Sequence, residues 1–363
     1  LYNIQITNNT SIGLYLSRSD PILENIQITN NVHQTRGGGM FLFLSNPTLK
    51  NVLVGGNTAL NGGGIYMQES DPIIQNAIIS NNTASEKGGG IFLTQSNPIL
   101  NNVIITGNSA DKGGGIHSDN SNPVIQNTSL ADNNSVSNYS GGIYCVGGSY
   151  INLINSVLWN NSPTQIFIQG VYAQNNEAIS YSDIQDGEDG IVISGTGILD
   201  WQEGNINEGP MFLRSGDHPY QINDYSPCID AGTPDTTGLN FPEFDIAGNP
   251  RFVNNRIDMG AYEWNMFVGV EEPDPDETET AKVSIYPNPL NDHLFIDFEL
   301  ENETNITLEI CNVTGKRMKA LTEKSYTRGA QHCEVKTEDL PPGIYFLRLQ
   351  AGNEVVTKKV VKL

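Results

Sequence analysis

Hydrophobic and polar positions alternate in short bursts along the first part of the chain, and the bursts return at a nearly fixed period. The phrase "SNPILNNVIITGN", which begins at Ser96, has close copies that begin at Ser19, Ser45, Ser70 and Ser121. The prolines of these phrases are spaced 26, 25, 26 and 25 residues apart. Each period holds β-rich stretches such as "NVIIT" and "GIFL", separated by Asn, Gly, Ser and Pro. This pattern predicts a solenoid of stacked coils.

Two rows of aliphatic residues recur at fixed places, two and seven residues after the proline. Coils of a parallel β-solenoid lie about 4.8 Å apart. Each aliphatic side chain can therefore rest on its equivalent in the next coil, and we expect both rows to point inward. The pattern predicts an all-β chain whose main part is a right-handed parallel β-helix, with three short strands per coil. The rows are Leu23, Leu49, Ile74, Leu100 and Ile125, and Ile28, Val54, Ile79, Ile105 and Leu130.

Two rows of asparagine and a series of glycine runs keep step with the aliphatic rows. Asn tolerates left-handed backbone geometry at turns, and stacked amides can bond along the coil axis, so we interpret both rows as structural. Strands rather than helices follow the glycines, which favours turns over a phosphate-binding loop. The asparagines are Asn25, Asn51, Asn76, Asn102 and Asn127, and Asn31, Asn57, Asn82, Asn108 and Asn133; the runs are Gly37–Gly39, Gly62–Gly64, Gly88–Gly90 and Gly113–Gly115.

A ring stands at one fixed position in each coil, in most coils two residues beyond a glycine run. Because successive strand residues point to opposite faces, the apolar neighbours of each ring take the inward places and the rings are expected to point outward. Such a ribbon suits sugar rings or a partner protein. The alternative is that the stacked rings only stabilise the sheet or are covered by loops. The ring positions are Tyr15, Phe41, Tyr66, Phe92, His117 and Tyr144.

The charge of the chain narrows the classes of partner. The 363 residues include 41 acidic and 19 basic ones, which gives a net charge of -22. Nucleic acids and anionic membranes require clustered Lys and Arg, so both are excluded as partners. No apolar run approaches the roughly 18 residues of a membrane helix, so we expect no transmembrane segment. Leu1 begins the second half of a repeat phrase, and we expect the chain to be part of a longer protein.

The period loosens after residue 161, and three motifs follow in order. They are "SPCIDAGTPD" at 226–235, "DIAGNPR" at 245–251 and "DMGAYEW" at 258–264. Together with the repeats they resemble secreted, pectin-lyase-like β-helix proteins of bacteria that carry varied cell-surface anchors. We therefore expect regular coils over 1–161, and irregular coils with a cap that closes the end of the helix over 162–264.

The last part of the chain has a different pattern. Residues 265–282 contain the acidic, proline-bearing "EEPDPDETET" and are expected to be a linker. Alternation in "LFIDFEL" and "IYFLRL" predicts a small Ig-like antiparallel β-sandwich over 283–363. This segment resembles the C-terminal sorting domain of type IX secretion in Gram-negative bacteria. The residues that carry the resemblance are Tyr286, Pro287, Asn288, Pro289, Gly315, Lys316, Pro341, Pro342, Gly343, Tyr345, Lys358 and Lys359.

The resemblance implies where the protein goes. The expected partner is the type IX secretion machinery, and the expected location is the extracellular space or the outer-membrane surface. The domain is usually cleaved and can leave the cargo attached to surface lipopolysaccharide. Cys311 and Cys333 lie in this domain, where they could pair or remain two free thiols.

Candidate chemistry is sparse. The acidic loop Asp183, Asp186, Glu188 and Asp189 could hold Ca²⁺, although a plain acidic loop is the favoured interpretation and no other cofactor is indicated. Polysaccharide lyases of this fold pair a calcium-binding acidic cluster with a basic residue. Arg36, Lys87 and Lys112 precede the glycine runs, beside Glu86 and Asp111, and are interpreted as solvated turn charges.

Two functions therefore remain open. The first is a non-enzymatic binding or adhesion module that engages glycans or host or matrix proteins through its repetitive face, with no catalytic residues. The second is a polysaccharide lyase or glycoside hydrolase that acts on acidic glycans.

Overall fold

The chain divides into two units, residues 1–265 and residues 266–363, and each is described by itself. The computed structural model describes residues 1–137, 139–170, 176–196, 198–239, 241–252, 256–264, 283–286, 290, 293–300, 302–312, 317–338, 340–341, 343–351 and 354–362. The expected linker at 265–282 lies outside these residues.

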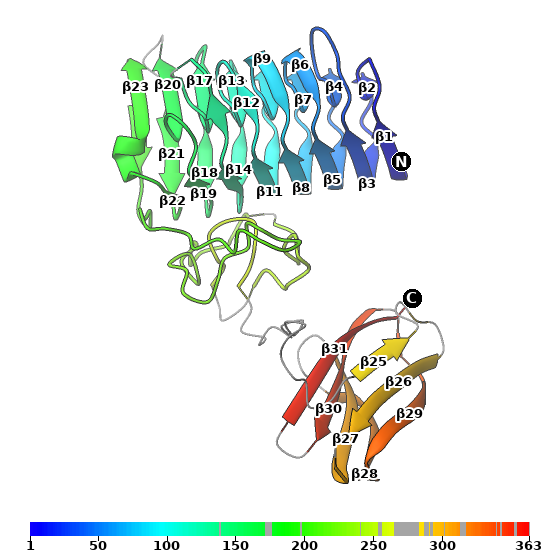
Figure 1. Cartoon of the computed structure of the whole chain (residues 1–363). Coiled ribbons are helices and arrows are strands. Elements are labelled where there is room, and N and C mark those ends of the chain that lie inside the picture. The colour runs from blue at the N-terminus through cyan, green and yellow to red at the C-terminus, as the bar shows by residue number, and fades with distance from the viewer. Residues whose placement is uncertain are drawn as a thin grey trace. The chain divides into compact units, whose positions relative to one another are not determined.

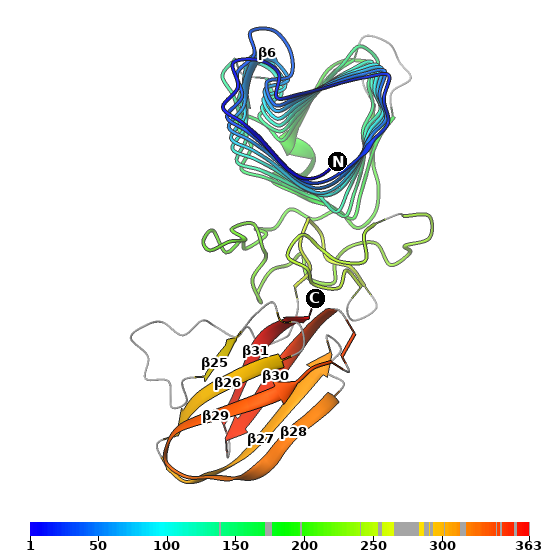
Figure 2. The same cartoon turned by 90° about the vertical axis from the view of Figure 1, so that its right-hand side faces the viewer.

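The first unit is a parallel β-solenoid whose coils superpose when viewed along the axis (Figures 1 and 2). Eight strands, one from each coil, form the second of its three sheets, which we call sheet B. The recurrent prolines stand in one column, because the backbone N–H after each of them donates to the proline carbonyl of the preceding coil. Thr48 bonds Pro21 at 3.1 Å in this way, and Ile73 bonds Pro47 at 3.1 Å. The predicted stacking of the repeats is therefore confirmed.

All three sheets pair their strands in parallel, coil to coil. Sheet A contains β1 (Tyr2–Thr7), β3 (Ile22–Thr29), β5 (Thr48–Gly55), β8 (Ile73–Ser80), β11 (Ile99–Thr106), β14 (Val124–Gln126), β15 (Ser129–Ala131), β18 (Asn152–Ile154), β19 (Val157–Trp159), β21 (Asn176–Ser180), β22 (Asp183–Ile184) and β24 (Ile198–Trp201). Sheet B contains β2 (Leu14–Ser17), β4 (Met40–Phe43), β7 (Ile65–Gln68), β10 (Ile91–Thr94), β13 (Ile116–Asp119), β17 (Ile143–Val146), β20 (Ile166–Gly170) and β23 (Ile191–Gly195). Sheet C contains β6 (Thr58–Asn61), β9 (Thr83–Lys87), β12 (Ser109–Ala110) and β16 (Asn134–Ser135), and one 3-10 turn, η1, spans Gly187–Gly190.

The interior of the coils holds both aliphatic rows, as predicted, and one row of asparagines. Every member of the two aliphatic rows is buried. The buried row runs from Asn31 to Asn133, and each side-chain amide donates to the next: Asn57 Nδ2 lies 3.0 Å from Asn82 Oδ1, and Asn82 Nδ2 lies 3.0 Å from Asn108 Oδ1. Because buried amides without partners are costly, this chain of bonds fixes the register of the coils.

The two asparagine rows differ in backbone geometry. The row that includes Asn25 is left-handed, with φ between 46° and 54°, as predicted. The buried row is not left-handed. There the residue one position earlier takes that geometry, as Asn30 does at φ 57° and Asn81 at φ 56°. The prediction of left-handed turns was therefore one residue out of place for the buried row.

The glycine runs are turns, as predicted. Their first members are left-handed, with Gly88 at φ 64°. Their later members press against the next coil: a Cβ on Gly64 would lie 2.5 Å from the carbonyl oxygen of Gly90. Only glycine fits where coils approach this closely.

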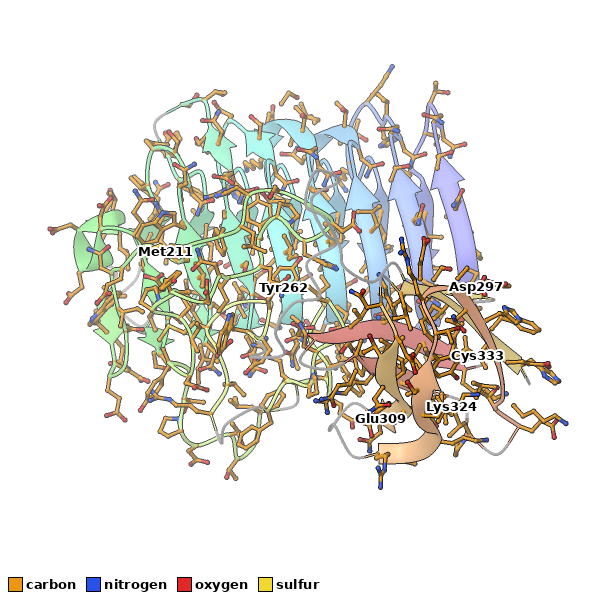
Figure 3. The ribbon with its side chains drawn as sticks, turned by 60° about the horizontal axis from the view of Figure 1, so that its bottom comes forward. Met211, Tyr262, Asp297, Glu309, Lys324 and Cys333 are labelled. Atoms are coloured by element: carbon orange, nitrogen blue, oxygen red, sulfur yellow. The ribbon has the colours of Figure 1, made fainter. Side chains whose placement is uncertain are left out.

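The described residues 210–239, 241–252 and 256–264, which we call the strap, cross the outer face of sheet A (Figures 1 and 3). Tyr262 and Ala261 pack against Ile104, while Phe212 and Cys228 pack against Val157 of β19. The strap thus covers the side of the solenoid over β8 to β22. The sequence placed a cap at the end of the helix instead, because the path of a returning segment depends on tertiary contacts that the repeat does not encode.

The second unit is a sandwich of two antiparallel sheets around one apolar core. The first sheet has the order β25-β26-β29 and the second the order β28-β27-β30-β31. Alternation places Leu294, Ile296 and Phe298 inside, which confirms the predicted pattern. The strands are β25 (Val283–Tyr286), β26 (His293–Leu300), β27 (Thr304–Asn312), β28 (Arg317–Tyr326), β29 (Gly329–Lys336), β30 (Gly343–Ala351) and β31 (Glu354–Lys362).

Candidate functional site

The predicted ring positions form one continuous column on the outer face of sheet B, which we call the ring column. Strand pairing sets each ring beside its equivalent, as in the pairs Phe41↔Tyr66 and Phe92↔His117. The ring centroids of neighbours from Tyr15 to Tyr144 lie 4.8–5.1 Å apart. Phe167, which the sequence reasoning did not include, extends the column beyond Tyr144 at 5.4 Å.

Most of the ring column is covered, which corrects the expectation of an exposed ribbon. Tyr15 is 52% exposed and Phe41 is half-buried, whereas Tyr66, at 7%, is buried. Phe92, His117 and Tyr144 are buried as well. Only the first two rings can therefore serve as open platforms, and for the other four the structure agrees with the alternative that loops cover them.

The cover comes from a projecting part of each coil, which we call the lobe: the residues between the buried asparagine and the glycine run. The lobe that contains β6 stands out from the coil outline (Figure 2). Phe92 follows Asn82 by ten positions, but Tyr15 follows Asn9, the equivalent of Asn82 in the first coil, by only six. The shortest lobe therefore accompanies the most exposed ring, Tyr15, whereas Phe41 is half-buried beneath a lobe as long as that of Phe92.

Three basic side chains from the lobes lie over the rings. Arg36 is 5.4 Å from the centroid of Tyr66, and Lys87 is 5.9 Å from that of Phe92. Lys112 is 4.5 Å from Tyr139, a ring that itself packs on Tyr144. Cations over aromatic faces are attracted by the ring quadrupole. The sequence interpreted these residues as solvated turn charges; Arg36 is indeed exposed, but Lys87 and Lys112 are half-buried.

The basic residues share one register along the solenoid. Lys87 and Lys112 pair directly across adjacent coils. Asn61 holds the same register position in the coil between Arg36 and Lys87, since it pairs with both of them. Glu86, which precedes Lys87, accepts a hydrogen bond from Asn61 at 3.5 Å, so one carboxylate also reaches this register. We call Arg36, Lys87 and Lys112 the cation row.

Burial shapes the protonation of the ring column. Burial, and next the nearby charge of Lys87, lowers the pKa of His117 to about 3, so its ring is neutral. The Lys112 backbone also interacts with the His117 ring, although among the described residues neither ring nitrogen makes a well-formed hydrogen bond. Burial likewise raises the pKa of Tyr144 to about 12. Asp119 lies on the same face and contributes to the raised pKa of both Tyr66 and Tyr144.

The four carboxylates of the acidic loop, which could have held Ca²⁺, do not form a single site. Asp183 is fully buried, where it accepts hydrogen bonds from the backbone N–H of Glu208 at 3.1 Å and from Cys228 Sγ at 3.4 Å. Asp186 flanks η1, while Glu188 and Asp189 lie in its first turn. Among the described residues, no group of three or more His, Cys, Asp or Glu side chains is placed to hold a metal ion.

The strap contains a buried polar cluster that the sequence reasoning did not single out. Arg251 is fully buried and donates to the carbonyl of Gly260 at 2.7 Å, and its Nη1 lies 3.3 Å from Glu263 Oε2. Asp258 accepts from the backbone N–H of Asp230 at 2.6 Å. A signal for the strap was present in the sequence, because Ile78 and Ile104, at equivalent outward positions of sheet A, are apolar.

The sorting-motif residues lie in the second unit wherever they are described. The Tyr286 hydroxyl donates to Asp297 at 2.8 Å, and the Tyr345 hydroxyl donates to the Pro341 carbonyl at 2.8 Å (Asp297 is labelled in Figure 3). Gly343 lies in β30, and Lys358 and Lys359 lie in β31. Pro287, Asn288, Pro289, Gly315, Lys316 and Pro342 lie outside the described residues.

The cysteines of the second unit are not bonded to each other. Cys311 and Cys333 are free and lie on β27 and β29, in different sheets. Cys333 Sγ lies 3.3 Å from the Tyr326 hydroxyl. Of the two alternatives left open by the sequence, the structure shows free thiols.

Comparison with known families agrees with this architecture. Residues 1–130 match the model of the right handed beta helix region, and residues 284–363 match that of the secretion system C-terminal sorting domain. No curated protein and no solved structure matched. The chain is therefore a right-handed parallel β-helix followed by an antiparallel sorting domain.

The sorting domain identifies the route of the protein. It is exported through type IX secretion to the extracellular space or the outer-membrane surface of a Bacteroidetes-type Gram-negative bacterium, which implies contact with the type IX machinery. Among the described residues, no helix is both long and apolar enough to span a bilayer.

Proposed function

We propose that the β-helix is a non-enzymatic binding module that holds a negatively charged glycan along the cation row. The observation that carries this proposal is the register of Arg36, Lys87 and Lys112 on the ring-facing side of the lobes. Like charges directly opposite each other on neighbouring strands are destabilising, and Lys87 and Lys112 stand in that relation. An anionic ligand that bridges them relieves this repulsion.

The rings beneath the cation row support the same proposal. Each cation is held above an aromatic face, which restricts its side chain and lowers the entropy that binding would cost. Among the predicted ring positions, Tyr15 and Phe41 are the least covered and offer an aromatic platform on which a sugar ring can stack. The ligand would therefore contact rings at one end and charges along the rest.

The overall charge limits the class of anion. At a net charge of -22 the protein repels polyanions of high charge density such as nucleic acids. A glycan with one carboxylate or sulfate every one or two sugars carries less charge and adds hydroxyl groups for hydrogen bonds. The carboxylate of Asp119, whose charge acts on Tyr66 and Tyr144, also repels negative charge near the ring column.

The experiment measures binding of uronate-containing and sulfated oligosaccharides by calorimetry. The double variant Lys87→Gln with Lys112→Gln is expected to bind about a hundredfold more weakly, because each of the two lost charge-assisted hydrogen bonds is worth about 1.5 kcal/mol. Arg18→Gln with Lys50→Gln is the matched control; it removes the same charge from exposed positions outside the column.

Three outcomes would contradict the proposal. The first is equal weakening by both double variants, which would indicate a general charge effect. The second is no binding of any acidic glycan by the wild-type chain. The third is release of unsaturated oligosaccharides from the acidic glycans, which would show a lyase.

Attachment to surface lipopolysaccharide after cleavage of the sorting domain stays a prediction from the resemblance. It predicts a surface-held form that lacks residues 283–363 and carries the additional mass of a lipopolysaccharide, measurable by mass spectrometry of the outer-membrane fraction.

A further inference from the structure

Sheet A carries a shallow depression on its outer face, over the first three coils. Its volume is about 380 Å³. It is lined by Asn3, Gln5, Asn25, Gln27, Asn51 and Leu53, so five of its six lining residues are side-chain amides. The three asparagines belong to the left-handed row, with φ of 53°, 54° and 52°, and they project from the bend of each strand.

The strap shows what these rows do further along the same sheet. Asn102, an equivalent of Asn25, donates from Nδ2 to the carbonyl of Phe244 in the strap at 3.0 Å. Ile104, the equivalent of Gln27, packs against Tyr262. Over β11 this face of sheet A therefore already contacts a polypeptide segment, namely the strap.

The open part of the face differs in chemistry from the strapped part. The row beneath the strap presents the apolar Ile78 and Ile104, which receive side chains of a polypeptide. Over β1 and β3 the same row presents Gln5 and Gln27, both exposed. A bound peptide would find few apolar contacts there, whereas hydroxyl groups would find both donors and acceptors. The substitution of amides for aliphatics favours a sugar over a peptide.

The depression also differs from the cation row. No charged side chain lines it, and its amides repeat from coil to coil at about 4.8 Å. Asn51 Nδ2 donates to Asn25 Oδ1 at 3.1 Å, which orients these two amides along the axis. Uncharged lining groups in a regular row suit a ligand that is itself uncharged and repetitive.

We propose that this depression binds a neutral glycan, with Gln5 and Gln27 as the residues that determine specificity and Leu53 as the apolar contact for a sugar face. The site is separate from the cation row in position and in chemistry. A protein with both sites could hold two different polysaccharides at the cell surface.

The test is calorimetry with uncharged oligosaccharides of cellulose, mannan and β-1,3-glucan. The double variant Gln5→Ala with Gln27→Ala is expected to bind its neutral ligand about tenfold more weakly, because it removes amide hydrogen bonds without altering the left-handed bends. The control is Gln75→Ala with Gln202→Ala, which removes two amides outside the depression and should leave binding unchanged.

A second arm separates this site from the proposed function. The Lys87→Gln with Lys112→Gln variant should keep its affinity for the neutral ligand, and the Gln5→Ala with Gln27→Ala variant should keep its affinity for acidic glycans. The inference is overturned if none of the neutral oligosaccharides binds, if the Gln5 and Gln27 variant binds as tightly as the wild type, or if an extended peptide displaces the sugar and binds more tightly. If neither the wild type nor any variant binds acidic glycans, the proposed function is overturned and the inference about the depression is not.

Discussion

The outer faces of sheet A and sheet B are built from the same repeat but are covered in different ways. On sheet B each coil covers its own ring with its own lobe, so the cover is local. On sheet A the cover is the strap, which reaches Asn102 from Phe244, 142 residues further along the chain. The difference shows that stacking fixes the positions of the side chains in a β-helix, whereas their availability depends on what lies above them.

The largest expected effect on stability comes from a substitution that destabilises the strap over sheet A. Arg251→Met removes the buried guanidinium that donates to the Gly260 carbonyl and lies 3.3 Å from Glu263, and leaving a buried acceptor without its donor costs about 1–3 kcal/mol. The strap should lose protection in hydrogen exchange while the coils keep theirs. Arg214→Met is the control: it removes the half-exposed partner of Asp132 and should cost about 1 kcal/mol or less. Equal protection of the strap in both variants would contradict the account.

The next effect concerns the pH dependence of the strap contact at Asp183. Burial raises the pKa of this carboxyl to about 7, so the folded state holds its proton more tightly than the unfolded chain. Its contribution to stability is present in full below about pH 4 and is lost as the pH rises through about 7. The free energy of unfolding should therefore be lower at pH 8 than at pH 5. In Asp183→Asn this slope should flatten, whereas Asp189→Asn, at an exposed position, should keep it.

The smallest expected effect on stability concerns two substitutions in the ring column of sheet B. His117→Phe should raise the free energy of unfolding by about 1 kcal/mol, because it removes two buried nitrogens that lack well-formed hydrogen bonds and keeps a ring in the column. Phe92→His at the neighbouring position should lower it. Chemical denaturation of both variants measures the pair. A loss of stability in His117→Phe would show that its nitrogens have a role that the geometry does not show.

The repeat made most of the solenoid predictable. Leu23 and Ile28 are interior because each coil places the same residue above the last, and this depends only on the period. The ring positions followed from alternation in the same way. Their exposure did not, although the shorter spacing from Asn9 to Tyr15 contained the relevant information.

The strap was less predictable from the sequence than the coils. Its fold depends on contacts between residues that the chain brings together only after the coils exist, such as Ser129 with Ala261. Ile78 and Ile104, apolar at outward positions, indicated that something covers sheet A but not which segment. The separation of the four carboxylates was not predictable either, because Asp183 is buried by its contact with Cys228 of the strap.

The central claim is that the ring column is continuous, exposed at Tyr15 where the lobe is shortest, and covered at Tyr66 and Tyr144. Hydroxyl-radical footprinting of Tyr15, Tyr66 and Tyr144 tests this most directly, since the three side chains are chemically identical and differ only in cover. The account predicts rapid modification of Tyr15, which is 52% exposed, and strong protection of Tyr66 and Tyr144, at 7% and 2%. Similar modification rates at all three tyrosines would contradict it.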